Sequence, residues 1–124
     1  MPLKVPEFLI RRIYVKGSLA RANDGFEFQL KNTLGSGYAK RMLPLSLNGS
    51  EIPLEQCGFQ IEGESKVHGF EEVTPETPFS LRMNRTSTIH VRDVGVPDGA
   101  VKLRMGFEVQ GIGDLSFEVT DTAK

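Results

Sequence analysis

Residues 100–109 constrain the fold of this chain more than any other segment. Their apolar side chains occupy every second position: Val101, Leu103, Met105, Phe107 and Val109. A period of two puts such side chains on one face of a strand, whereas a helix would scatter them around its circumference. The segment therefore predicts a long β-strand with one buried face.

Shorter runs of the same alternation recur along the chain between turn residues. The 13 glycines and 7 prolines interrupt the sequence too often for long helices, but suit short strands joined by turns. Further strands are predicted at 8–15, 26–33, 43–47, 50–54, 59–61, 67–73, 79–83, 89–91 and 115–119.

The connections carry turn residues with a physical basis. Asn48-Gly49 favours a type I′ turn, which matches the twist of two paired strands. Asp24-Gly25 predicts a turn because glycine accepts a positive φ without steric cost. The segment 74–78 holds two prolines and predicts a loop, and Pro97-Asp98-Gly99 predicts another.

About eight to ten short strands, with no helix longer than a turn, predict an all-β fold. We expect an antiparallel two-sheet sandwich, with jelly-roll and immunoglobulin-like connectivities both open. The 124 residues fit one domain. It is predicted to span 1–124, with flexible ends at 1–6 and 120–124.

Charge and composition argue against several classes of protein. The net charge is −1 and the isoelectric point is about 6.1, so nucleic acid is not an expected partner. No apolar run approaches the ~20 residues that a membrane span needs, and the first residues lack a signal-peptide core. The lone Cys57 and these absences predict a cytoplasmic protein.

The residues that most often carry catalysis or bind metals are sparse. His68, His90 and Cys57 do not fall at ligand spacings, and a surface role for the histidines explains the pattern more simply. Gly35-Ser36-Gly37 lacks the following helix that a phosphate site requires. We therefore predict no catalytic residue, metal or cofactor in this chain.

Several basic side chains fall on the non-core phase of their strands. If those strands are neighbours, the side chains form one basic face. The simpler interpretation is that this face is exposed to solvent, and the more specific one is that it binds a partner protein. Tyr38 is added as an aromatic candidate. The predicted partner-binding residues are therefore Arg82, His90, Arg92, Arg104 and Tyr38, and Lys102 extends the same face.

The order of these features resembles a known family. Gly25-Phe26-Glu27-Phe28-Gln29-Leu30, a glycine-rich loop with Tyr38, and the segment 43–52 (LPLSLNGSEI) are similar to the β subunit of bacterial C-glycoside deglycosidases. The resemblance implies a β-sandwich that supports a larger TIM-barrel catalytic subunit holding a divalent metal. It thus implies an accessory subunit of a carbon–carbon lyase acting on 3-oxo-C-glycosides.

Other functions remain open beside that one. A carbohydrate-binding or other ligand-binding module is an alternative, for which only Tyr14 and Tyr38 offer aromatic platforms. A small jelly-roll enzyme would need His68 and His90 to converge on a metal. Chains of this pattern are also labelled as hydroxymethylglutaryl-coenzyme A reductases, but neither a nicotinamide site nor an acid–base set is found. Homo-oligomerisation is also open.

Overall fold

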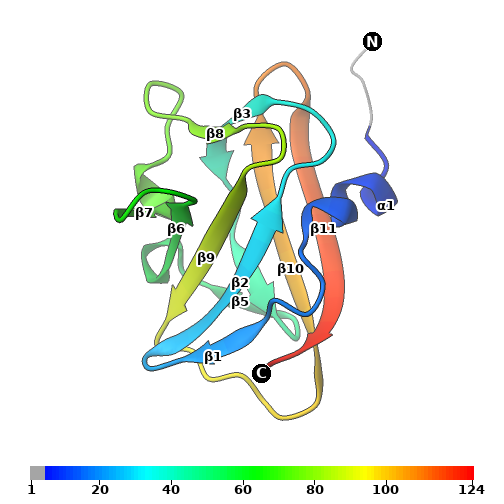
Figure 1. The fold of residues 1–124 in the computed structure, drawn as a ribbon, viewed down its shortest axis with the longest axis vertical. Coiled ribbons are helices and arrows are strands. Elements are labelled where there is room, and N and C mark those ends of the chain that lie inside the picture. The colour runs from blue at the N-terminus through cyan, green and yellow to red at the C-terminus, as the bar shows by residue number, and fades with distance from the viewer. Residues whose placement is uncertain (1–4) are drawn as a thin grey trace.

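Two antiparallel sheets packed against each other make up most of the structure, a computed structural model that describes residues 5–124 (Figure 1). One sheet has five strands in the order β1 (Ala20–Ala22), β2 (Gly25–Lys31), β9 (Thr86–Arg92), β6 (Cys57–Ile61) and β7 (Val67–Gly69). The other has six: β5 (Ser50–Ile52), β4 (Leu45–Leu47), β10 (Ala100–Val109), β3 (Gly37–Met42) and β8 (Phe79–Leu81), with β11 (Gly113–Thr122) paired to β10. The predicted antiparallel sandwich is confirmed.

Strand β10 is the centre of the six-stranded sheet, and its predicted extent is confirmed. It pairs with β11 along its whole length, from Ala100 opposite Thr122 to Val109 opposite Gly113. Along its other edge, β4 pairs with Leu103 and Arg104, and β3 pairs with the following stretch from Phe107 to Val109. Between them the Leu43 amide donates to the Gly106 carbonyl, so the pairing continues across the break.

The core lies between the two sheets and is built from the alternating apolar side chains. Phe26, Phe28 and Ile89 of the five-stranded sheet are at most 1% exposed, as are Leu103 and Met105 of the other. Burying a side chain of this size is worth about 1.5–3 kcal/mol. The sheets also meet through Phe59 and Phe79, whose ring centroids are 4.1 Å apart.

The strand predicted at 8–15 is wrong. The segment forms α1 (Glu7–Ile10) and the 3₁₀ turn η1 (Arg11–Ile13), and only Tyr14 makes an isolated bridge, to Leu30. The Pro6 carbonyl accepts the amides of Leu9 and Ile10, which starts a helical turn. Helical spacing then buries Ile10 and Ile13, three residues apart, on one side.

Several strand boundaries differ from the predictions; for example, the strand predicted at 67–73 ends at Gly69, where η3 (Phe70–Glu72) follows. Strand β8 ends at Leu81, so Met83 is exposed instead of continuing the alternation. Strand β11 runs to Thr122 because β10 offers it a partner as far as Ala100, although a polar tail is predicted from Thr120. Of the predicted flexible end at 1–6, residues 1–4 lie outside the described residues.

The short remaining turns have specific roles. The 3₁₀ turns η2 (Leu54–Gln56) and η3 (Phe70–Glu72) flank β6 and β7. Asn48 and Gly49 have φ values of 51° and 86°, which confirms the predicted type I′ turn. Gly25 serves another purpose than predicted: it starts β2, and a Cβ there would lie 1.9 Å from the Val91 carbonyl oxygen.

The N-terminal segment covers the outer edge of β11 (Figure 1). Arg11 Nε donates to the Glu118 carbonyl at 2.9 Å, and the Glu118 amide donates to Glu7 Oε2 at 3.3 Å. Arg11 and Glu7 also form an ion pair at 3.2 Å. Side chains thereby satisfy backbone groups that an uncovered edge would present to other strands. Within residues 5–124, no helix has the length and apolar character needed to cross a membrane.

Candidate functional site

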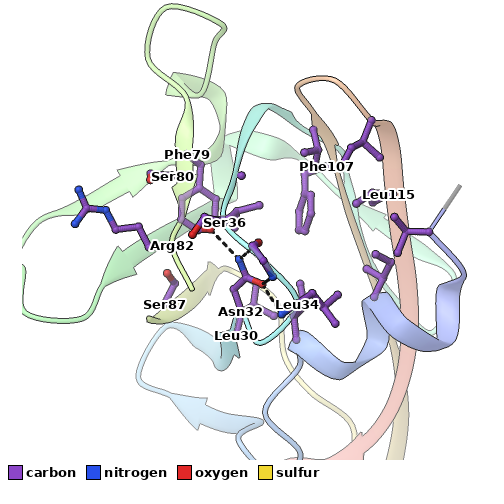
Figure 2. A pocket seen from close by; sticks show the side chains of 18 of the residues that line it. Leu30, Asn32, Leu34, Ser36, Phe79, Ser80, Arg82, Ser87, Phe107 and Leu115 are labelled. Atoms are coloured by element: carbon purple, nitrogen blue, oxygen red, sulfur yellow. Dashed lines mark hydrogen bonds between the residues drawn. The ribbon is translucent and has the colours of Figure 1, made fainter. Parts of the chain in front are cut away.

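A cavity of about 380 Å³ opens between the two sheets, beside α1 and the loop that follows β2. Both sheets contribute walls: Figure 2 shows Leu30 of the five-stranded sheet, and Phe79, Phe107 and Leu115 of the six-stranded sheet. Apolar residues of the N-terminal segment and of the nearby loops complete the lining: Val5, Leu9, Ile10, Ile13, Leu34, Leu81, Val109 and Ile112.

Two polar residues are buried in the part of the chain that the structure describes, and both line this cavity. Asn32 is 9% exposed and Ser87 is 6% exposed. Ser87 lies opposite Leu30 on the neighbouring strand, so it points to the same core face as Ile89. Asn32 follows Leu30 by two residues. The hydroxyl and the amide therefore interrupt an otherwise apolar surface at one end of the five-stranded sheet.

The Asn32 side chain shapes the cavity wall. Its Nδ2 donates to the carbonyls of Gly35 and Leu81 at 2.7 and 2.8 Å. Its Oδ1 accepts the amides of Leu34 and Gly35 at 3.1 and 3.3 Å. Four hydrogen bonds use the full capacity of the amide, so Asn32 fixes the loop against β8 and has no group left for a ligand.

The Ser87 hydroxyl is in the opposite situation. Among residues 5–124, it makes no hydrogen bond to another group. Every fully enclosed side-chain polar atom in that range has a partner, so the Ser87 hydroxyl must be open to the cavity. The hydroxyl is therefore open to water or to a molecule bound in the cavity. A ligand with a donor or acceptor would satisfy it.

Two arginines lie beside this end of the cavity. Arg85 is half-buried and lines the cavity, and its Nη2 donates to the Ser80 carbonyl at 2.5 Å. Arg82 is exposed, and Figure 2 shows its side chain extending away from the cavity. Both arginines also line a cleft of about 470 Å³ outside β8.

The predicted single basic face does not form. His90 and Arg92 belong to β9 of the five-stranded sheet, whereas Lys102 and Arg104 belong to β10 of the other sheet. The outer faces of two stacked sheets point in opposite directions, so these groups are separated. Arg82 follows β8, and Tyr38 on β3 is 53% exposed. The partner-binding role of these residues stays a prediction.

The two histidines do not converge. His68 pairs opposite Phe59 and stacks on its ring, with centroids 5.1 Å apart, on the core-facing side. His90 pairs opposite Gly58, one residue out of phase, and so points to the outer face, where Nε2 lies 3.2 Å from Gln60 Oε1. Residues 5–124 contain no group of three potential metal ligands. Tyr14 is buried, which leaves Tyr38 as an exposed tyrosine for carbohydrate stacking.

Cys57 is a core residue, 3% exposed, at the start of β6. Burial, assisted by the Glu55 carboxylate, raises the pKa of its thiol to about 11. The thiolate is the reactive form of cysteine, so this environment disfavours nucleophilic chemistry.

The fold and the cavity define an antiparallel β-sandwich with a ligand-sized apolar space between its sheets. A family model described as "Hydroxymethylglutaryl-CoA reductase, N-terminal domain" matches residues 9–124. The chain therefore belongs to this family. No curated protein matches it.

The family match corrects the predicted resemblance to C-glycoside deglycosidase β subunits, which is wrong. The accessory role in a lyase is wrong with it. The TIM-barrel partner and the divalent metal of that partner rested on the resemblance alone and lose their support. The hydroxymethylglutaryl-CoA reductase family, an alternative that was rejected because no reductase chemistry is found in the sequence, is the family to which the chain belongs. The cytoplasmic location stays a prediction.

The cavity was not predicted, although the sequence carries a signal for it. Phe26, Phe28 and Leu30 define the core phase of β2, and the next position in that phase is Asn32. Ser87 likewise shares the core phase of Ile89 and Val91 on β9. Two polar residues in the core phase of two strands mark a place where the interior is not simply packed.

Proposed function

We propose that this chain is a ligand-binding β-sandwich domain whose ligand is a small molecule with a compact apolar body. The observation that carries the proposal is the cavity of about 380 Å³ between the sheets. Protein interiors hold few voids larger than a water molecule, and ligand pockets have volumes of roughly 300–1,000 Å³. A space of this size fits a binding site better than a packing defect.

The lining supports the same role. Aromatic and aliphatic walls surround a very small number of polar groups, which is the usual composition of a small-molecule site. Phe79, Phe107 and Leu115 would hold the apolar body (Figure 2). The unpartnered Ser87 hydroxyl would fix the orientation through one hydrogen bond.

The family description names the N-terminal domain of a reductase, and we place this chain in a binding role within that family. Reducing a thioester needs a bound hydride donor and a positioned acid or base. In the described part of the chain, His68 and His90 lie on opposite sides of their sheet, and Cys57 is buried with a raised pKa. These groups do not assemble an acid–base site, which supports binding over reduction.

Titration calorimetry with 1-octanol, checked by methyl-resolved NMR, tests the proposal. We expect saturable binding with shifts at Leu30, Leu115 and Ile112. Ile112→Trp should fill the cavity and abolish binding, whereas Val67→Trp should not, because Val67 is exposed on β7 and lines no part of the cavity. Circular dichroism would confirm that both variants fold. Absence of saturable binding to the unmodified chain, or equal binding by both variants, would overturn the proposal.

A further inference from the structure

Resting on the proposed function, we infer that the ligand carries a carboxylate, which Arg85 and Ser87 bind at one end of the cavity while the apolar body lies between the sheets. The ligand class is thus a monocarboxylic acid with a short apolar chain or ring. This class follows from how these two side chains are placed and from which of their polar groups remain without a partner.

The Arg85 guanidinium has N–H donors that no group among the described residues uses. A guanidinium has five N–H donors, and that of Arg85 makes one hydrogen bond to a described residue, at the Ser80 carbonyl. Within residues 5–124, no carboxylate lies within ion-pair distance of it. A planar fork of donors suits a carboxylate, which it binds through two parallel hydrogen bonds.

Three carboxylates near Arg85 make other contacts. Glu62 Oε1 accepts the amide of the adjacent Thr86 at 3.3 Å. Glu64 and Glu72 line the cleft outside β8 together with Arg85. Glu64 Oε1 lies 3.5 Å from His68 Nε2, and Glu72 Oε2 accepts the Gly69 amide at 2.8 Å. Residues 5–124 therefore supply no counter-ion to Arg85, and an external one would not have to displace a carboxylate among them.

The position of Arg85 also suits an amphipathic acid. It lines both the cavity and the outer cleft, so its half-buried guanidinium stands where the apolar interior meets solvent. A carboxylate bound there keeps part of its hydration while its apolar body leaves water. Partial burial also strengthens the charge interaction compared with a fully exposed pair.

Ser87 adds a donor on the cavity side. Ser87 follows Arg85 by two residues and is 6% exposed. Its hydroxyl makes no hydrogen bond to another described residue and, because it is not fully enclosed, is open to the cavity. A carboxylate has two oxygens and accepts several hydrogen bonds, so one anion can satisfy both side chains.

Calorimetric titration with octanoate and 1-octanol at neutral pH separates this inference from the proposed function. The two probes have the same chain length and differ in charge. We expect octanoate to bind about tenfold more tightly, the effect of one charge-assisted hydrogen-bonded contact. Arg85→Gln should remove this advantage and Arg85→Lys should keep part of it. Raising the salt concentration should reduce it.

Arg92→Gln is the matched control. Arg92 lies at the other end of β9 and donates one hydrogen bond to a backbone carbonyl, that of Glu55, as Arg85 does to Ser80. This variant should keep the octanoate advantage. Equal affinity for the two probes, or an advantage that survives in Arg85→Gln, would overturn the inference and leave the proposed function standing. Failure of both probes to bind the unmodified chain would overturn the proposed function itself.

Discussion

The Tyr14 hydroxyl donates a hydrogen bond of 2.6 Å to Oδ2 of Asp121, a residue 107 positions further along the chain. The same oxygen accepts the Gly17 amide at 3.0 Å. Burial, and then the hydrogen bond to the Asp121 carboxylate, raise the pKa of Tyr14. For Asp121, burial acts to raise the pKa, but the hydrogen bonds from Tyr14 and from backbone amides outweigh it, so the pKa is lowered.

Replacing Tyr14 with phenylalanine should destabilise the fold. The change removes a donor from a carboxylate that stays in place, and hydrogen bonds to charged groups contribute about 1.5–3 kcal/mol. We expect the free energy of unfolding in urea to fall by about 1.5 kcal/mol. Tyr38→Phe is the control because Tyr38 is 53% exposed and makes no side-chain hydrogen bond among the described residues. Equal stability of Tyr14→Phe and the unmodified chain would contradict the assignment.

Asp121 should make the stability depend on acid pH. Because its folded pKa is lowered, the unfolded chain binds the proton more readily, and the stabilisation is complete above the ordinary pKa of 3.8. It is lost as the pH falls from there through the folded pKa. Urea midpoints between pH 7 and pH 2 should therefore fall less in Asp121→Asn than in the unmodified chain. Parallel pH profiles for the two proteins would rule this out.

Gly25 should not tolerate a methyl group. A Cβ at this position would lie 1.9 Å from the Val91 carbonyl oxygen, so β2 and β9 would have to separate. Overpacking of this kind costs about 1–3 kcal/mol, and we expect that loss for Gly25→Ala in thermal or urea unfolding. Gly95→Ala is the matched control, since a Cβ at Gly95 meets no atom within 4 Å. Similar stabilities of the two variants would show that the strands adjust freely.

Ser87 should contribute to binding and little to stability. Ser87→Ala removes a hydroxyl that makes no hydrogen bond to another described residue and is open to the cavity, so we expect the free energy of unfolding to change by no more than about 0.5 kcal/mol. Octanoate should bind it several-fold more weakly. Ser18→Ala provides the contrast: the Ser18 hydroxyl accepts the Gln29 amide at 2.9 Å, so its loss should destabilise. A Ser87→Ala variant destabilised as much as Ser18→Ala would mean that the hydroxyl is structural.

Cys57 should react only when the chain unfolds. Its pKa of about 11, against 9.0 for an ordinary thiol, lowers the thiolate fraction at pH 8 by roughly a hundredfold, and burial blocks access as well. Iodoacetamide labelling followed by mass spectrometry should therefore be at least that much slower in the native protein than in urea. Labelling at the unfolded rate would show that β6 opens readily.

The strands were predictable because alternation reports which face of a strand is buried. Leu103, Met105 and Phe107 face the core as their spacing requires, and the Asn48-Gly49 turn has the backbone that its residues favour. The helical turns at Ile10 and Ile13 were not predictable, because a short apolar run fits a strand and a helical turn equally well. Tertiary contact with β11 and the Pro6 carbonyl decide between them.

The site was less accessible to sequence reasoning. The strand phase of Arg92 and Arg104 shows that they avoid the core, but not that their strands belong to different sheets, which depends on long-range pairing. The cavity depends on packing between elements that are distant in sequence, such as Leu9 and Phe79. Its only local trace is the polar character of Asn32 and Ser87 at core positions.

The cover that Glu7 and Arg11 provide for β11 has a consequence for synthesis on the ribosome. Glu118, whose backbone they satisfy, is translated more than a hundred residues after them, as the separations of 107 and 111 positions show. The segment with Glu7 and Arg11 must therefore wait for β11 before these contacts can form. Until β11 has been made, β10 has no partner along that edge, so a nascent chain leaves the edge of its long central strand open.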